Sequence, residues 1–349
     1  MLSRVANSLY WMWRYIERAE NIARIVDVNL QLLLDFRNLN EERLALYWLP
    51  IVQTTGDETQ FFQLHRKATG NAVTEFLVFQ MENPNSIVSS ICQARENARM
   101  VRDQITIEFW EELNRLYWFV KTPQARKVWN ESPSEFFQQI KNSSLLLNGL
   151  SYATLIHNEG WWFSKVGEFI ERADKTSRIL DVRYQPPPEG APARNGGNTV
   201  ENDALEWSAI LRSCSAWDAY KSTYGAEVNP KLVAEFLMFN VDFPRSVRFC
   251  VAELNYALRR ISGVAEGRFC NSAEKLAGRL VAELQFSTVD EIFEFGLHGY
   301  LDQLQTKLNN IGIAMFDAYI FQKFNNLEEE IMVQQEEQQQ QFAPEPTYE

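Results

Sequence analysis

The sequence predicts an all-α protein. Apolar residues recur at helical spacing along most of the chain, and the alternating pattern that is typical of strands is almost absent. Glycine is scarce, with 15 residues in 349, and most prolines cluster where a break is expected. Residues 86–120 contain no helix breaker and predict one long helix. We therefore expect a large helical bundle of about ten helices.

Three segments of the first half of the chain recur in the second half. The matching pairs are residues 14–28 with 168–182, 45–48 with 204–207, and 75–91 with 235–251, at offsets of 154, 159 and 160. Chance likeness between amphipathic helices would not preserve the order and the spacing of three segments. The sequence therefore predicts a duplication, and we expect two pseudo-symmetric helical repeats, 1–157 and 158–327.

Two segments lack the composition of a packed helix. Residues 185–203, "QPPPEGAPARNGGNTVEND", are rich in proline and glycine and predict an exposed loop inside the second repeat. Residues 328–349 consist mainly of Gln, Glu and Pro, with little to bury, and we expect this tail to be largely disordered.

Charge and hydropathy exclude several classes of protein. The net charge of -12 argues against a nonspecific nucleic-acid binder, which needs surplus cations to displace the counterions of phosphate. No apolar run reaches the length of a transmembrane helix, and the N-terminus lacks the pattern of a signal peptide, so we expect no membrane insertion. The four cysteines have no CxxC spacing, which is typical of free thiols in the cytoplasm.

The first matching pair carries the candidate functional residues. Four charges recur at the offset of 154: Glu17, Arg18, Arg24 and Asp27 reappear as Glu171, Arg172, Arg178 and Asp181. Neighbouring polar positions drift: Arg14, which we include as the ninth candidate residue, becomes Glu168. A helix face that is only solvated tolerates any polar residue. Because these four charges are retained while neighbouring polar residues change, they indicate a fixed geometric role.

Two roles fit the retained charges. Each glutamate could receive a bidentate arginine from the other repeat in a buried network, or the arginines could converge on an anion or a carboxylate where the repeats meet. Both predict that removing Arg18 or Arg172 abolishes function. Only the network predicts a large loss of stability, about 3 to 5 kcal/mol for stripping one partner from a buried pair.

Other recognisable chemistry is absent from the sequence. The three histidines belong to no ExxH, HExxH or HxH arrangement, and the usual phosphate-binding loops GxxxxGK[ST] and GxGxxG are missing. We therefore expect no metal and no cofactor. The cluster "HNEGWWF" combines His157 and Glu159 with two tryptophans, but a lone histidine beside aromatic residues is more typical of packing than of catalysis.

Several stretches together resemble a known family. "SLYWMWRYIERAENIARIVDV", "GEFIERADKTSRILDVRY" and "ENPNSIVSSICQARENARMVRDQIT" with the following "EFWEELNRLY" resemble the bacterial alpha-E domain family, an all-helical family named for its Glu-Arg motif. The resemblance extends over roughly residues 1–324. Glu168 departs from the family pattern, which favours Arg after the glycine at 167.

The resemblance implies a cytoplasmic partner of other proteins. Such proteins are encoded or fused beside a circularly permuted ATP-grasp protein similar to amide-bond ligases of the glutamate-cysteine ligase type 2-like group, and often near a transglutaminase-like protein. We therefore expect a noncatalytic helical partner of an amidoligase system that makes or modifies a peptide or an amino-acid-derived compound. The alternative is an enzyme or small-ligand binder with a Glu/Arg-lined pocket for a carboxylate-bearing substrate. A third possibility is an adaptor that recruits partners through its tail.

Overall fold

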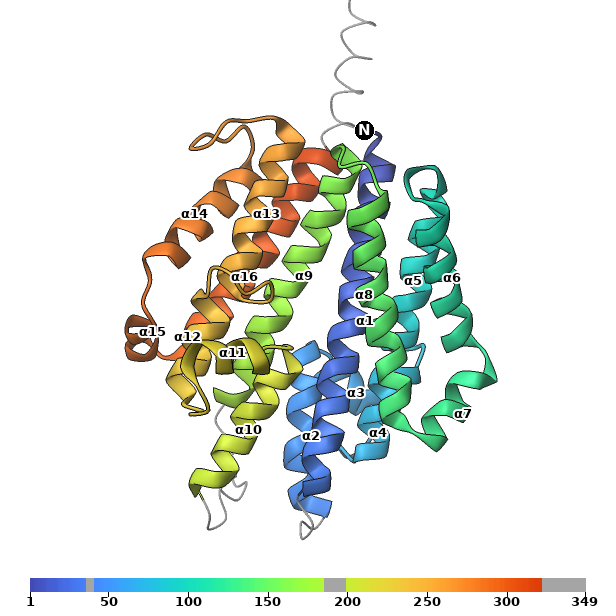
Figure 1. Ribbon diagram of the computed structural model, residues 1–349, viewed down its shortest axis with the longest axis vertical. Helices are drawn as coiled ribbons and strands as arrows, with labels where there is room; N and C mark the ends of the chain where they lie inside the picture. Colours follow the sequence, from blue (N-terminus) through green and yellow to red (C-terminus); the bar gives the residue numbers. More distant parts are fainter. Residues whose placement is uncertain (36–40, 185–198, 322–349) are drawn as a thin grey trace, which may run out of the picture.

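A computed structural model describes residues 1–35, 41–184 and 199–321 (Figure 1). These residues form helices joined by turns and contain no strand, so the all-α prediction is confirmed. The described part of the chain offers no helix with the length and apolar character that a bilayer crossing requires.

Sixteen α-helices are present in the described residues. Those before residue 158 are α1 (Ser3–Asp35), α2 (Glu41–Thr55), α3 (Glu58–Leu64), α4 (Gly70–Thr74), α5 (Ile87–Met100), α6 (Ile107–Lys121), α7 (Pro123–Glu131) and α8 (Pro133–Thr154). Those after it are α9 (Glu159–Tyr184), α10 (Thr199–Ser213), α11 (Trp217–Tyr224), α12 (Pro230–Phe239), α13 (Val247–Ser262), α14 (Ser272–Phe286), α15 (Val289–Phe295) and α16 (Leu297–Phe316). Two π-helical turns, Glu75–Phe79 and Asp317–Phe321, and one 3₁₀ turn, Arg102–Gln104, complete the described elements.

The expected number of about ten helices is wrong, for two reasons. The run expected as one long helix is divided, because α5 ends at Met100 and the Thr106 hydroxyl caps α6 by accepting the backbone N–H of Phe109 at 3.3 Å. Val101 and Ile105 are buried between the two helices, so tertiary packing decides the break. The other added elements include several helices shorter than ten residues, which are too short to show a clear period in the sequence.

The predicted loop and tail fall mainly outside the described residues. This applies to 185–198 and to the whole segment 328–349. Residues 199–203, expected as the end of the loop, instead open α10. All prolines and glycines of that segment lie before residue 198, so nothing in "TVEND" prevents a helix from starting there.

Helices α1 and α9 lie side by side through the middle of the molecule, with α5 to α8 on one flank and α12 to α16 on the other (Figure 1). The two central helices approach closely at Gly167, where a Cβ atom would lie only 2.2 Å from the backbone oxygen of Tyr10. Helix α1 contributes to both hydrophobic cores, with Trp13 in the larger and Ile22 in the smaller. The expected boundary at 157/158 falls in the turn between α8 and α9, and the division into repeats stays a prediction.

Candidate functional site

The candidate site is the seam between α1 and α9. Six side chains form its centre, and we call them the Glu-Arg network. They are Arg14, Glu17 and Arg18 of α1, Glu171 and Arg172 of α9, and Arg245 from the turn before α13. Amphipathic sequence places these charges on the faces of α1 and α9 that meet, next to apolar residues that pack the same seam. Most of the network's partners are therefore more than 150 residues apart in the chain.

Glu171 is held by two arginines of α1. Its side chain is 0% exposed, and it accepts Nε of Arg14 at 2.6 Å and Nε of Arg18 at 2.7 Å. Burial alone would raise the pKa of this carboxyl, but the charges of Arg14, Arg18 and Lys175 hold the pKa well below its ordinary value. Glu171 is therefore an ionised, fully paired carboxylate.

Glu17 is held by arginines from two different elements. Arg172 of α9 makes a bidentate pair, with Nε 3.0 Å from Oε1 and Nη2 2.9 Å from Oε2. Arg245 adds Nη1 at 2.8 Å from Oε1. Burial acts to raise the pKa of Glu17, and the two guanidinium groups overcome it and lower the pKa to about 2.

Acidic neighbours extend the network along both helices. Glu20 accepts Nε of Arg24 at 2.8 Å and the Ser144 hydroxyl at 2.5 Å, and it also contacts Arg245. Asp174, the residue at the offset of 154 from Glu20, accepts Nε of Arg178 at 2.9 Å. Arg24 and Arg178 thus pair within their own helices, and neither crosses the seam to the central carboxylates.

The two aspartates of the sequence prediction lie apart from the network. Asp27 accepts Nζ of Lys141 on α8 at 2.8 Å. Asp181 contacts Nδ1 of His298 on α16 at 2.6 Å. Both aspartates therefore hold flanking helices against the central pair. Of the nine predicted residues, the structure brings five together in the network and places the other four around them.

Sequence reasoning missed two important members of the site. Arg245 was visible only as one of several arginines after Pro244, because its counterpart at the offset of 160 is Asn85. Glu168, in the place of Arg14, is buried and bridges Nζ of Lys165 at 2.7 Å and Nη2 of Arg172 at 2.6 Å. Position 168 thus holds a glutamate where the first half has Arg14, and Arg245 supplies the second positive charge on Glu17.

The arrangement leaves little scope for chemistry at the two central glutamates. Glu17 and Glu171 are fully paired and are 1% and 0% exposed, so neither reaches a solute without separation of the two helices. Arg14 and Asp174 alone among these charges border a hollow, of about 560 Å³ between α1, α9 and α16. Within the described residues, no three His, Cys, Asp or Glu side chains gather as a metal site would require.

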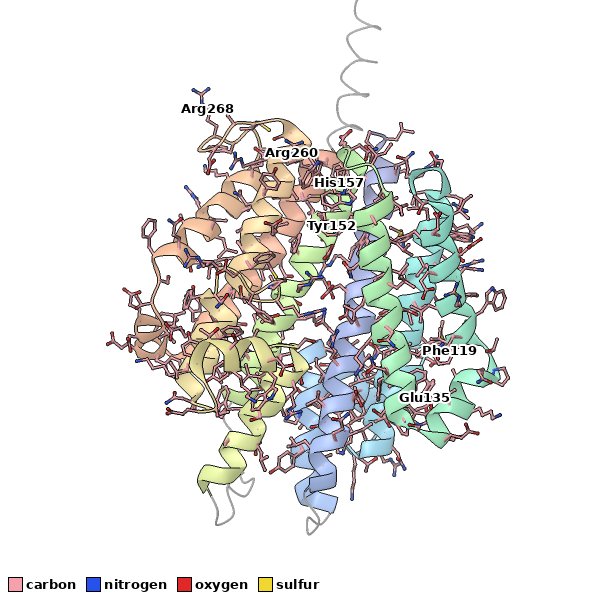
Figure 2. The ribbon with its side chains drawn as sticks, viewed as in Figure 1. Phe119, Glu135, Tyr152, His157, Arg260 and Arg268 are labelled. Atoms are coloured by element: carbon pink, nitrogen blue, oxygen red, sulfur yellow. The ribbon has the colours of Figure 1, made fainter. Side chains whose placement is uncertain are left out.

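The histidine cluster before α9 has structural partners. His157 stacks on Trp161 with ring centroids 3.9 Å apart, and it lies near Tyr152 at the end of the molecule where the chain starts (Figure 2). Glu159 accepts the N-terminal amine of Met1 at 2.9 Å. These contacts tie the start of α1 to the start of α9.

Comparison with known proteins identifies the family. A family model named Alpha-E, described as a predicted alpha-helical domain with a conserved ER motif, matches residues 1–320. Uncharacterised proteins of Mycobacterium bovis and Mycobacterium tuberculosis are 23% identical over 332 residues, which cover 90% of this chain and 36% of each relative. The chain thus spans little more than a third of the length of these relatives. No solved structure matches it. Because the family model covers nearly the whole chain, and Glu-Arg pairs occur at both 17–18 and 171–172, the protein belongs to the Alpha-E family.

Proposed function

We propose that this protein acts in the bacterial cytoplasm as the noncatalytic helical partner of an ATP-grasp amide-bond ligase of the glutamate-cysteine ligase type 2-like group. The state of the Glu-Arg network carries the proposal. Its two central carboxylates are ionised, buried and saturated with arginine, so they are suited to holding a helical body together and unsuited to acting as a free base. The amidoligase system makes or modifies a peptide or an amino-acid-derived compound, and a transglutaminase-like protein is a further partner.

The length of the relatives supports a role beside another polypeptide. Because the match occupies only 36% of each mycobacterial protein, the Alpha-E region is there joined to a longer chain. Joining two domains raises their effective concentration toward each other, which favours domains that work together. We propose that this chain works together with an equivalent companion.

A body built from two repeats is part of the proposal. The described elements support it, since α5 and α13 begin 160 residues apart, each after a serine cap. Ser86 accepts the backbone N–H of Ser89 and Ser246 accepts that of Phe249, both at 3.1 Å. Eight α-helices precede residue 158 and eight follow it in the described residues. Two similar flanks would give a partner two related docking faces.

Co-purification and ATP turnover test the proposal. The ATP-grasp protein encoded beside this chain is assayed with an amino-acid mixture, with and without this protein. We expect the two proteins to co-purify and the helical protein to raise ATP turnover. If they do not co-purify and turnover is unchanged, the proposed partnership fails.

A ligand-binding alternative rests on the hollow beside Arg14. Ile313 borders this hollow and Ile107 lies on α6, and both are 62% exposed, so they form a matched pair for substitution. If L-glutamate raises the melting temperature of the wild type and of Ile107→Arg but not of Ile313→Arg, the hollow binds a carboxylate and the alternative is favoured. The partner role would be favoured if both variants gave equal ATP turnover by the ATP-grasp protein and glutamate left every melting temperature unchanged.

A further inference from the structure

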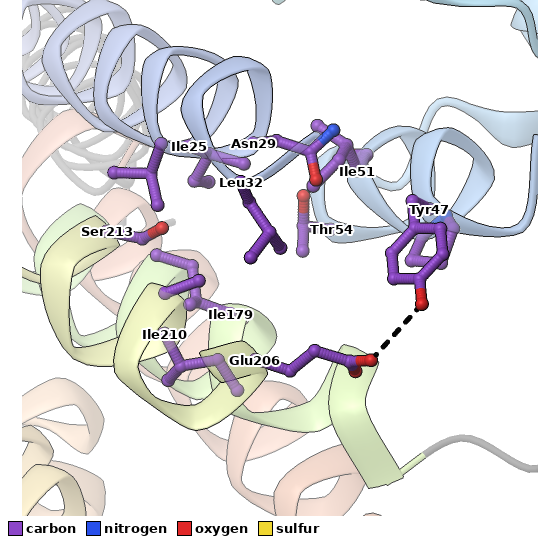
Figure 3. A pocket seen from close by; sticks show the side chains of 13 residues that line it. Ile25, Asn29, Leu32, Tyr47, Ile51, Thr54, Ile179, Glu206, Ile210 and Ser213 are labelled. Atoms are coloured by element: carbon purple, nitrogen blue, oxygen red, sulfur yellow. Dashed lines mark hydrogen bonds between the residues drawn. The ribbon is translucent and has the colours of Figure 1, made fainter. Parts of the chain in front are cut away.

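Two of the hollows in the described structure differ in size. The smaller, of about 100 Å³, lies between α1, α2, α9 and α10, and there the carboxylate of Glu206 accepts the Tyr47 hydroxyl at 3.5 Å (Figure 3). The larger is the hollow of about 560 Å³ between α1, α9 and α16 that Arg14 borders. Sites for small-molecule ligands usually measure roughly 300 to 1,000 Å³, so the larger hollow has the size of a binding site.

The walls of the larger hollow are mainly aromatic and aliphatic. The ring of Phe316, at the end of α16, has its centroid 5.5 Å from that of Tyr10 and 6.1 Å from that of Trp11 on α1. Ile313 and Phe321 also line the hollow, and they are 62% and 57% exposed. Large apolar side chains that face a hollow and remain exposed to water favour a ligand with an apolar part.

One charge in these walls has no counter-charge. Three of the lining residues are charged, namely Arg14, Asp174 and Asp317. Arg14 pairs with Glu171, and Nε of Arg178 donates to Asp174 at 2.9 Å. The side chain of Asp317 is exposed and makes no hydrogen bond or ion pair within the part of the chain that the structure describes. The unbalanced charge of the hollow is therefore negative, which favours a ligand with a cationic group.

The backbone at Asp317 has an uncommon conformation. Residues Asp317–Phe321 form the π-helical turn that follows α16, and the first and last residues of this turn both line the hollow. The same two residues also border a further hollow of about 450 Å³, where Asp317 is again the one charged lining residue among those described. π-Helical turns are rare and occur frequently at functional sites. This turn thus places a carboxylate and an aromatic ring in the wall of one hollow.

We propose that the hollow between α1, α9 and α16 binds a small primary amine that carries an aromatic ring. The ring packs on Ile313, Phe316 and Phe321, and the ammonium group donates to the carboxylate of Asp317. The carboxylate-binding alternative relies instead on Arg14, whose charge Glu171 already offsets. The two hypotheses therefore predict opposite charges for the ligand of one hollow. This inference concerns the isolated chain and is independent of the proposed partnership.

Three compounds with one phenylethyl skeleton test the chemistry: phenethylamine, phenethyl alcohol and hydrocinnamate, which end in a cation, a neutral group and an anion. Binding to the full chain is measured by NMR titration at pH 7. We expect the amine to bind, the alcohol to bind about three- to tenfold more weakly, and hydrocinnamate at least about tenfold more weakly, because it meets the charge of Asp317. Equal binding of amine and alcohol, tighter binding of hydrocinnamate, or no amine binding with a Kd below about 10 mM would overturn the proposal.

Asp317→Asn tests the carboxylate. The substitution removes the charge and keeps the size of the side chain, so we expect about three- to tenfold weaker binding of phenethylamine and unchanged binding of phenethyl alcohol. Asp302→Asn is the matched control, because Asp302 is also exposed, lies on α16 and does not line the hollow. Unchanged affinity for the amine in Asp317→Asn, or an equal loss in Asp302→Asn, would refute the role of Asp317.

Ile313→Arg tests the location. Its long cationic side chain would fill the hollow and pair with Asp317, so we expect phenethylamine binding to be lost. Ile107→Arg is matched, because Ile107 and Ile313 are both 62% exposed, and it should bind the amine as the wild type does. Melting temperatures confirm that both variants fold. Full binding by Ile313→Arg, or an equal loss in both variants, would place the amine elsewhere and refute the site.

Discussion

Glu17 and Glu171 occupy corresponding positions in the two halves of the chain, yet their arginines come from different places. Glu171 receives both of its arginines, Arg14 and Arg18, from α1. Glu17 receives Arg172 from α9 and its second arginine, Arg245, from the turn before α13. The two carboxylates therefore keep the same number of neutralising guanidinium groups although the residues that supply them differ.

The difference follows from two substitutions between the halves. Position 168 holds a glutamate where the first half has Arg14, and position 245 holds an arginine where the first half has Asn85. Asn85 instead accepts Nη1 of Arg18 at 2.7 Å. A buried carboxylate with too few partners is strongly destabilising, so loss of the cation at one position is tolerated when another cation reaches the same oxygens.

Among the substitutions that test this comparison, Arg172→Met should change the free energy of unfolding most. The substitution removes the bidentate partner of Glu17 and one partner of Glu168, which both stay buried. We expect the free energy of unfolding to fall by about 3 to 5 kcal/mol, measured by urea denaturation. Arg99→Met is the control, because Arg99 is 60% exposed and its pair with Glu96 is worth less than about 1 kcal/mol. A loss no larger than that of the control would show that the network is not a stabilising one.

Acid should weaken the network through its glutamates. The pKa of Glu17 is about 2 in the folded protein, below its ordinary value, so the unfolded chain takes up the proton first as the pH falls. The stabilisation is complete above about pH 5 and is lost as the pH falls toward 2, with about 3 kcal/mol at stake for this one group. Urea unfolding of the wild type and of Glu17→Gln across that range measures it. The difference between them should shrink with falling pH, and a constant difference would contradict the low pKa.

The sequence predicted the all-α class and named five of the six residues of the Glu-Arg network. Helical period and scarce strand patterns are properties of neighbouring residues, so the all-α class was accessible. The bidentate pair of Arg172 with Glu17 was one of two alternatives, because retained charges indicate fixed geometry without telling which partner fixes it. The role of Arg245 was not accessible, since it depends on how elements distant in the chain pack together.

Removing the partners of Asp27 and Asp181, which lie apart from the Glu-Arg network, should give the smallest effects on the free energy of unfolding and sharpen the comparison. Asp27 is paired with Lys141, whose side chain is 15% exposed, whereas Asp181 is paired with His298, which is 50% exposed. Water screens the second pair more strongly, so Lys141→Met should lower the free energy of unfolding by about 1 to 2 kcal/mol and His298→Gln by less than about 1 kcal/mol. Urea denaturation at pH 7 measures both. Equal losses would mean that burial of the aspartate, and not exposure of its partner, decides the strength of each pair.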